Sequence, residues 1–295
     1  MYVNVVVGIN GLAGDQDAVA LAKVLAPRHD RFALAHVRLI EAVASRGSSS
    51  AFDVAARDAS SELLERQASA LARNAEVVST SAMSVGAGLH EVAESRGADL
   101  IVVGSCHRSA VGRIFAGDDA RSVLHHAPCA VAVAPAGFAR GLGKTGKIAA
   151  AYDGSDESKV AIAHASLLAA ELDGEVVTRC VVEPHVYGGG GWMSAVSSLE
   201  DAESAVAAAR ERLGDLNGAE LEVIVGPVRE ELAALSERVD VLVCGSRHQS
   251  AVKRVALGST SDYLARHSAC PLLVTPAADE KTLTAWHDLR DAAAV

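Results

Sequence analysis

Short apolar runs alternate with longer amphipathic stretches along most of the chain. In the second half the apolar runs predict strands near residues 147–152, 175–182, 220–225, 240–245 and 271–275. In the first half they predict strands near residues 3–9, 31–39, 76–81, 99–104 and 129–134. Intervening stretches place apolar residues on one helical face, as in Val228, Leu232, Leu235 and Val239. Strands that alternate with helices in this way indicate parallel βαβ units, so an α/β fold is expected.

Polar residues predict where two of the helices begin and end. Ser155, followed by Asp156 and Glu157, predicts a helix start with a hydroxyl cap and acidic residues in the first turn. Gly174 is expected to follow the last turn of this helix as its terminating glycine. Pro227 predicts the first position of a later helix.

The chain contains an internal duplication. Leu100–Pro135 matches Val241–Pro276 without a gap at an offset of 141 residues, and Val6–Gly11 pairs with Ala149–Gly154. The repeat is therefore as large as a whole domain. We predict a first domain over residues 1–138, a second over 146–278, a linker over 136–146 and an amphipathic tail helix over 279–295.

Right-handed crossovers restrict how the strands of each domain can be ordered. Two doubly wound five-stranded parallel sheets of order 3-2-1-4-5, with helices on both faces, are expected. Ligands in such sheets bind outside the carboxyl ends of the strands, at the point where the order reverses. The loops at that point are Asn10-Gly11 and Gly104–Asp118 in the first half, and Asp153-Gly154 and Gly245–Ser259 in the second.

Composition excludes several classes of protein. Half of the 295 residues are apolar, only 3% are aromatic, and the formal net charge is -10, which argues against a nucleic acid partner. The apolar runs fall short of the ~20 residues of a membrane span. Five cysteines without CxxC spacing indicate buried free thiols in a reducing compartment. No export signal follows Met1, so we expect a cytoplasmic protein.

The loops of the second half carry phosphate-binding chemistry. Gly245 to His248 is followed by nine residues and then by Gly258-Ser259-Thr260 at the start of a helix. A helix start of this kind offers backbone N–H groups, hydroxyl groups and a positive dipole end to an anion. Asp153 stands across the crevice, where its carboxylate could meet a ribose hydroxyl or Mg²⁺. Asp153-Gly154-Ser155 alone is also compatible with an ordinary capped turn between a strand and a helix.

These motifs resemble those of ATP-binding universal stress proteins. The resemblance extends from Val3 to Pro276, as two consecutive copies of the family's domain. The family has an Asp at the end of strand one, a Val after strand two, and Gly-x-x-Gly-x9-Gly-Ser/Thr after strand four. The resemblance implies ATP or ADP as ligand, with Mg²⁺ optional, Asp153 at the ribose or metal, and Val181 near adenine. The implied nucleotide-binding residues are Ala151, Tyr152, Asp153, Val181, Cys244, Gly245, Arg247, His248, Gly258, Ser259, Thr260 and Ser261.

Both halves depart from the family pattern at its second glycine, which is replaced by His107 and His248. A non-glycine residue forced to positive φ costs about 1–2 kcal/mol. A charge-assisted hydrogen bond from histidine to phosphate, worth about 1.5–3 kcal/mol, could offset that cost. Reduced affinity, a new phosphate contact and a loop histidine without a ligand all remain open at this point.

The first half departs further, because Asn10 replaces the strand-one Asp and Asp118-Asp119 replace the Ser-Thr pair. One like charge at ~4 Å and an effective dielectric near 20 is unfavourable by about 4 kcal/mol. We therefore expect a degenerate site, although Asp118 could also serve simply as a helix cap. The residues of this degenerate site are Asn10, Val37, Gly104, His107, Gly117 and Asp118.

Three functions compete: an ATP-binding regulatory stress protein, a nucleotide-free interaction module, and an ATP-cleaving enzyme. The enzyme is disfavoured because the sequence has no Gly-x4-Gly-Lys-Ser/Thr loop and no Gly-x-Ser-x-Gly elbow. The segments Ser45–Ser50 and Gly188–Trp192 are interpreted as flexible loops or as lids. The resemblance also implies that the two halves pair across their fifth strands. The protein partner is unknown, and pairing of whole chains into a homodimer stays open.

Overall fold

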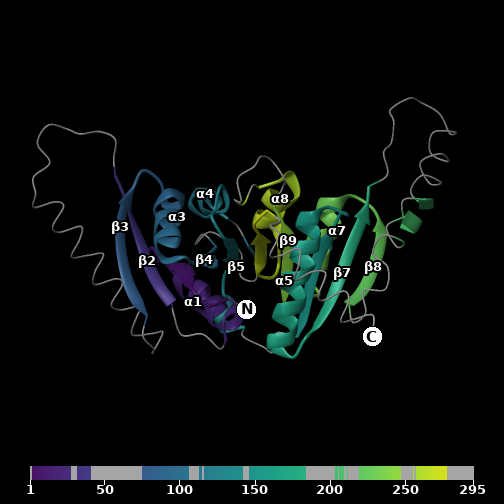
Figure 1. The fold of residues 1–295 in the computed structure, drawn as a ribbon, viewed down its shortest axis with the longest axis horizontal. Helices are drawn as coiled ribbons and strands as arrows, with labels where there is room; N and C mark the ends of the chain where they lie inside the picture. Colours follow the sequence, from purple (N-terminus) through teal and green to yellow (C-terminus); the bar gives the residue numbers. More distant parts are fainter. Residues whose placement is uncertain are drawn as a thin grey trace, which may run out of the picture.

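The computed structural model describes residues 2–27, 32–40, 75–105, 113–114, 116–141, 146–183, 203–204, 206–208, 211, 219–246, 255 and 257–277. All of the strands in this part belong to one ten-stranded sheet, drawn in Figure 1. The first half contributes β1 (Val5–Gly8), β2 (Phe32–Leu39), β3 (Glu76–Ala82), β4 (Leu100–Gly104) and β5 (Ala130–Ala134). The second half contributes β6 (Lys147–Tyr152), β7 (Glu175–Val182), β8 (Ala219–Val225), β9 (Val241–Gly245) and β10 (Leu272–Thr275).

The sheet runs in the order β3-β2-β1-β4-β5-β10-β9-β6-β7-β8. In each half, counted from the outer edge of the sheet toward the junction, the order is third, second, first, fourth and fifth strand of that half. All neighbours are parallel except β5 and β10, which are antiparallel and join the two halves. The α/β class expected from the sequence is therefore confirmed, and β3 and β8 lie at opposite ends of the sheet (Figure 1).

Helices cover both faces of the sheet because consecutive strand residues point to opposite sides. Val5 and Val7 of β1 belong to the core on one face, whereas Val6 belongs to the core on the other. The first core includes side chains of α1 (Gly14–Leu25) and α5 (Asp156–Leu172). The second core includes side chains of α3 (Val85–Arg96), α4 (Asp118–Leu124), α7 (Val228–Leu235) and α8 (Ser259–His267).

The start of α5 confirms one predicted helix end, and its last turn corrects another. The Ser155 Oγ accepts a hydrogen bond from the Ser158 N–H at 3.2 Å, as expected of an N-cap. The left-handed residue that ends the helix is Asp173, with φ 54°, and not Gly174 as predicted. Gly174 is needed for space, because a Cβ there would lie 2.5 Å from the Gly146 carbonyl oxygen.

The two halves meet around a pseudo-twofold axis. In the β5–β10 pair, Ala132 lies opposite Leu273, its own equivalent in the duplication. Equivalent backbone bonds flank this pair: the Ile114 N–H donates to Ser268 at 2.7 Å, and the Val255 N–H donates to Ala127 at 2.9 Å. The Arg121 Nε also contacts the Asp262 Oδ1 at 2.9 Å, and these two positions are again equivalent.

Four of the five cysteines are described, namely Cys129, Cys180, Cys244 and Cys270, and all four are buried free thiols as predicted. Cys106, Ser45–Ser50, Gly188–Trp192 and the tail over 279–295 lie outside the described residues. Within the part of the chain that the structure describes, no helix has the length and apolar character that crossing a membrane requires.

Candidate functional site

The second half has a cavity of about 420 Å³ at the carboxyl ends of β6, β7 and β9. This is where a doubly wound sheet is expected to bind a ligand. The size falls within the ~300–1,000 Å³ typical of ligand pockets. The residues that line it are Ala151, Tyr152, Asp153, Ser155, Glu157, Ser158, Arg179, Val181, Val228, Leu232, Cys244, Gly245, Ser246, Gly258, Thr260 and Ser261.

Asp153 lies in the turn between β6 and α5, on the wall of this cavity. Gly154 follows with φ 91°, a left-handed conformation that glycine adopts without strain. The Asp153 Oδ1 accepts hydrogen bonds from the Ser155 N–H at 3.0 Å and from the Ser155 Oγ at 2.5 Å. Because both bonds end on Oδ1, they leave Oδ2 available for a ligand.

The start of α8 forms a further part of the wall. Its first N–H groups have no partner within the helix, and the helix dipole makes this end positive. The Ser261 Oγ accepts a hydrogen bond from the Gly258 N–H at 2.9 Å and so organises the helix start. Gly258, Thr260 and Ser261 line the cavity, whereas Ser259 does not.

Two buried polar atoms on the cavity wall have no hydrogen-bond partner among the described residues. They are the Oγ of Ser246, which is 3% exposed, and the Nε of Arg179, which is also 3% exposed. The Nη2 of Arg179 pairs with the Glu222 Oε2 on the neighbouring strand β8. Neither residue was predicted from the sequence, although an Arg within the apolar strand Glu175–Val182 was a visible signal.

Another part of the wall is apolar. Val181 on β7 and Val228 and Leu232 on α7 line the cavity, as does Cys244 at the end of β9. Burial raises the pKa of the Cys244 thiol to about 12, so this side chain is neutral at physiological pH. Gly245 is required by packing, because a Cβ there would lie 2.6 Å from the Glu157 carbonyl oxygen of α5.

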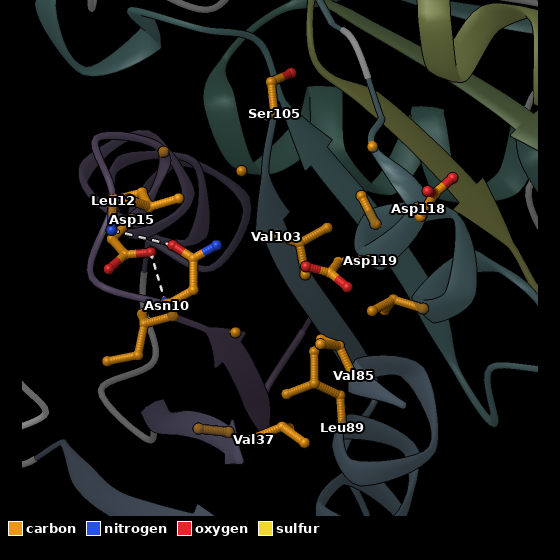
Figure 2. Close-up of a pocket in the computed structure, with 18 residues that line it drawn as sticks. Asn10, Leu12, Asp15, Val37, Val85, Leu89, Val103, Ser105, Asp118 and Asp119 are labelled. Atoms are coloured by element: carbon orange, nitrogen blue, oxygen red, sulfur yellow. Dashed lines mark hydrogen bonds between the residues drawn. The ribbon is translucent and has the colours of Figure 1, made fainter. Parts of the chain in front are cut away.

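The first half has an equivalent cavity of about 400 Å³, shown in Figure 2. Asn10, Val37, Gly104, Gly117 and Asp118, all assigned to the degenerate site, line it. Three carboxylates also line it, those of Asp15, Asp118 and Asp119. Asp15 lies on the side of Asn10, whereas Asp118 and Asp119 lie on the opposite side at the start of α4 (Figure 2).

Asp15 was not recognised from the sequence. It is 3% exposed and accepts hydrogen bonds from the N–H groups of Asn10 at 3.0 Å and Gly11 at 2.7 Å. Burial raises the pKa of this carboxyl group, and the two backbone N–H bonds oppose the rise. The protein's own carboxylate therefore already occupies the N–H groups of the strand-one turn.

Sequence comparison identifies the family. The model of the universal stress protein family matches residues 1–135 and again residues 144–276. The chain belongs to the universal stress protein family. A universal stress protein of Mycobacterium bovis is 29% identical over 204 residues, which are 65% of this chain and 69% of that protein. A universal stress protein of Methanocaldococcus jannaschii is 27% identical over 136 residues, 43% of this chain and 80% of that protein.

One solved structure shares the fold over most of the chain. The crystal structure of a universal stress protein from Archaeoglobus fulgidus covers 92% of this chain and 98% of its own, with 17% identity and a TM-score of 0.63. One further universal stress protein was solved in complex with cAMP; it covers 45% of this chain and 98% of its own at 20% identity and a TM-score of 0.32.

The structure describes most of the nucleotide-binding residues that the family resemblance implies. Nine of the twelve assigned residues of the second half line its cavity: Ala151, Tyr152, Asp153, Val181, Cys244, Gly245, Gly258, Thr260 and Ser261. Arg247 and His248, and His107 in the first half, lie outside the described residues. No group of three or more His, Cys, Asp or Glu side chains is arranged to hold a metal ion within the described ranges.

Proposed function

We propose that the second half of this universal stress protein binds ATP or ADP and that the chain acts as a nucleotide-binding regulatory protein. The observation that carries the proposal is the convergence of three features on one cavity: the start of α8 and the two unpartnered buried atoms, Ser246 Oγ and Arg179 Nε. Buried polar groups without partners are rare in proteins, and a polar ligand would satisfy them.

The phosphates are assigned to the start of α8. The N–H groups of its first turn and the Thr260 hydroxyl suit an anion, and the helix dipole adds to the attraction. Asp153 faces them across the cavity with Oδ2 available, so Mg²⁺ held by the phosphates would have one protein carboxylate within the site. A lone carboxylate with phosphate oxygens is a common way for proteins to hold Mg²⁺.

The base is assigned to the other end of the cavity. Strands β9 and β7 both neighbour β6 and are therefore about 10 Å apart, two strand spacings. A nucleotide is long enough to span from α8, beyond β9, to β7. Val181 on β7 and Val228 and Leu232 on α7 offer apolar surface to the faces of a base.

The first half is proposed not to bind nucleotide. Its cavity carries three carboxylates, whereas the second cavity carries two, Asp153 and Glu157, together with the cation Arg179. Like charge at the phosphate position opposes binding by several kcal/mol (about 4 for one charge at ~4 Å). One nucleotide per chain is therefore expected at saturation.

The role is proposed to be binding and not catalysis. At the second cavity, the Cys244 thiol is protonated at physiological pH and so is not a ready nucleophile. Any turnover of ATP is expected to be slow and incidental.

Two measurements test the proposal. Denaturing the purified chain should release adenine nucleotide, identified by absorbance and mass spectrometry. Titration calorimetry of nucleotide-free chain with ATP and Mg²⁺ should give one site per chain. A chain that carries no nucleotide and gives no binding heat up to millimolar ATP would instead be an interaction module built on the same fold.

A further inference from the structure

The charged pair of Arg179 and Glu222 at the floor of the second cavity has no counterpart in the first. Arg179 lies opposite Ala151 on β6 and opposite Glu222 on β8. Gly8 is the equivalent of Ala151, and it lies opposite Ala35, which in turn lies opposite Val78. The duplication thus places an Arg–Glu pair where the first half has an Ala–Val pair.

This comparison shows that the fold does not need the charged pair. Ala35 and Val78 occupy the same register and join an apolar core. Burying an ion pair costs desolvation free energy that its mutual attraction often fails to recover, so an apolar pair is commonly as stable. Arg179 is 3% exposed and its Nε has no partner among the described residues, so its stabilising contact within the protein is incomplete.

The guanidinium is presented to the cavity as a donor. Arg179 lines the cavity, whereas Glu222 does not. A guanidinium has hydrogen-bond donors only, so the ligand atom that meets it must be an acceptor. Arg179 is two residues deeper along β7 than Val181, and both therefore point to the same face of the sheet, the face that α7 covers.

We propose that Arg179 donates a hydrogen bond to a ring nitrogen of the purine base and thereby holds the base in the second site. The inference rests on the proposed function, since it assigns a contact within the nucleotide site. The base would insert between β7 and α7 with an acceptor edge toward Arg179. Glu222 holds the guanidinium in place and compensates its charge, and so is a positioning residue.

The test is titration calorimetry of the full chain with ATP and with three analogues, in each of which N1, N3 or N7 of adenine is replaced by carbon. A hydrogen bond to a charged donor corresponds to a loss of about 10- to 100-fold in affinity. One analogue should show this loss with the unmodified chain. The penalty should vanish in the double variant Arg179→Ala, Glu222→Val, which reproduces the pair already present in the first half.

A second variant separates the contact from general damage to the fold. Glu222→Gln keeps the guanidinium and should keep the penalty for the same analogue. Equal affinities of all three analogues and ATP for the unmodified chain would overturn the role of Arg179, as would a penalty that persists in the double variant. No binding of ATP by the unmodified chain would overturn the proposed function and this contact together, whereas ATP binding with equal analogue affinities would overturn only the contact.

Discussion

Asp153 and Asn10 stabilise the same turn in the two halves, but Asp153 adds a negative charge to its cavity and Asn10 does not. The Asn10 Oδ1 accepts from the Leu12 N–H at 3.1 Å, as the Asp153 Oδ1 accepts from the Ser155 N–H at 3.0 Å. The turn therefore requires a side-chain oxygen at this position, but not a negative charge. The negative charge of Asp153 is therefore available to bind a ligand.

Because of this difference, substitution of Asp153 tests the proposed nucleotide site directly. Asp153→Ala should weaken ATP binding by about 10- to 100-fold, the equivalent of ~1.5–3 kcal/mol for a hydrogen bond to a charged group. Asp153→Asn is the matched control, because it keeps the turn as Asn10 does but removes the charge. We expect both variants to lose affinity in calorimetry and only Asp153→Ala to lose thermal stability. Unchanged affinity in both would remove Asp153 from the site.

Single residues were the hardest feature to predict from sequence. Asp153, Gly258 and Thr260 were found because they follow strand ends or begin a helix, where chain direction alone places them at the cavity. Arg179 was missed because it lies inside β7, and Asp15, in the first turn of α1, was missed because its bonds to the Asn10 and Gly11 N–H groups form only in the folded turn. Their position on the cavity wall depends on which face of a strand or helix turns inward, and only packing determines that.

Helix starts distinguish the two cavities more than any other element. Both α4 and α8 begin after an extended glycine, Gly117 and Gly258. The first turn of α4 carries Asp118 and Asp119 on the cavity wall, whereas that of α8 presents Thr260 and Ser261 there. The acidic residue in the first turn of α8, Asp262, does not line the cavity and pairs with Arg121. The same backbone geometry thus repels an anion in one half and attracts it in the other.

Converting the first helix start should create a second site, which reaches its full affinity only if Asp15 is also changed. Asn10→Asp, Asp118→Ser and Asp119→Thr copy the second half, yet Asp15 still occupies the Asn10 and Gly11 N–H groups. Adding Asp15→Ser copies Ser158, the residue at the equivalent position of α5. Calorimetry should give two ATP sites for the quadruple variant. The triple variant should bind at its first half at least ~10-fold more weakly, since one buried like charge remains.

The unmodified chain is the control for this conversion. It should titrate with one ATP per chain. Two sites in the unmodified chain would show that the carboxylates of Asp118 and Asp119 do not oppose phosphate.

Strand boundaries were predicted to within about two residues because each is determined by local pattern, whereas Pro227, expected at the first position of a helix, directly precedes the first residue of α7, Val228. The ends of β6 and β7 agree with the expected ranges 147–152 and 175–182 to the residue. The error at the end of α5 has a physical cause: two adjacent residues, Asp173 and Gly174, can both end a helix, and Gly174 is used for its close approach to Gly146. Sequence alone does not show that approach.

At the scale of the molecule, the two halves are not interchangeable across their pseudo-twofold axis. Positions on the axis face their own equivalents, and in a symmetric dimer they would carry identical side chains. Here Arg121 faces Asp262, and Ala132 faces Leu273. A charge meets its opposite and a small side chain meets a large one, so each half complements the other better than it would complement a copy of itself.

The pair of Ala132 and Leu273 allows this complementarity to be measured. Both side chains are fully buried in the same core and lie directly opposite in the antiparallel register. Leu273→Ala should lower the free energy of unfolding by about 2–5 kcal/mol, because it leaves a cavity at the junction of the halves. Adding Ala132→Leu returns the lost volume from the other strand and should recover part of that loss in chemical denaturation.

Leu242→Ala, on β9 and in the core of the opposite face, is the matched control, and Ala132→Leu should not rescue it. Strictly additive effects of Ala132→Leu and Leu273→Ala would mean that the two side chains do not share one space, and the junction described for β5 and β10 would be wrong.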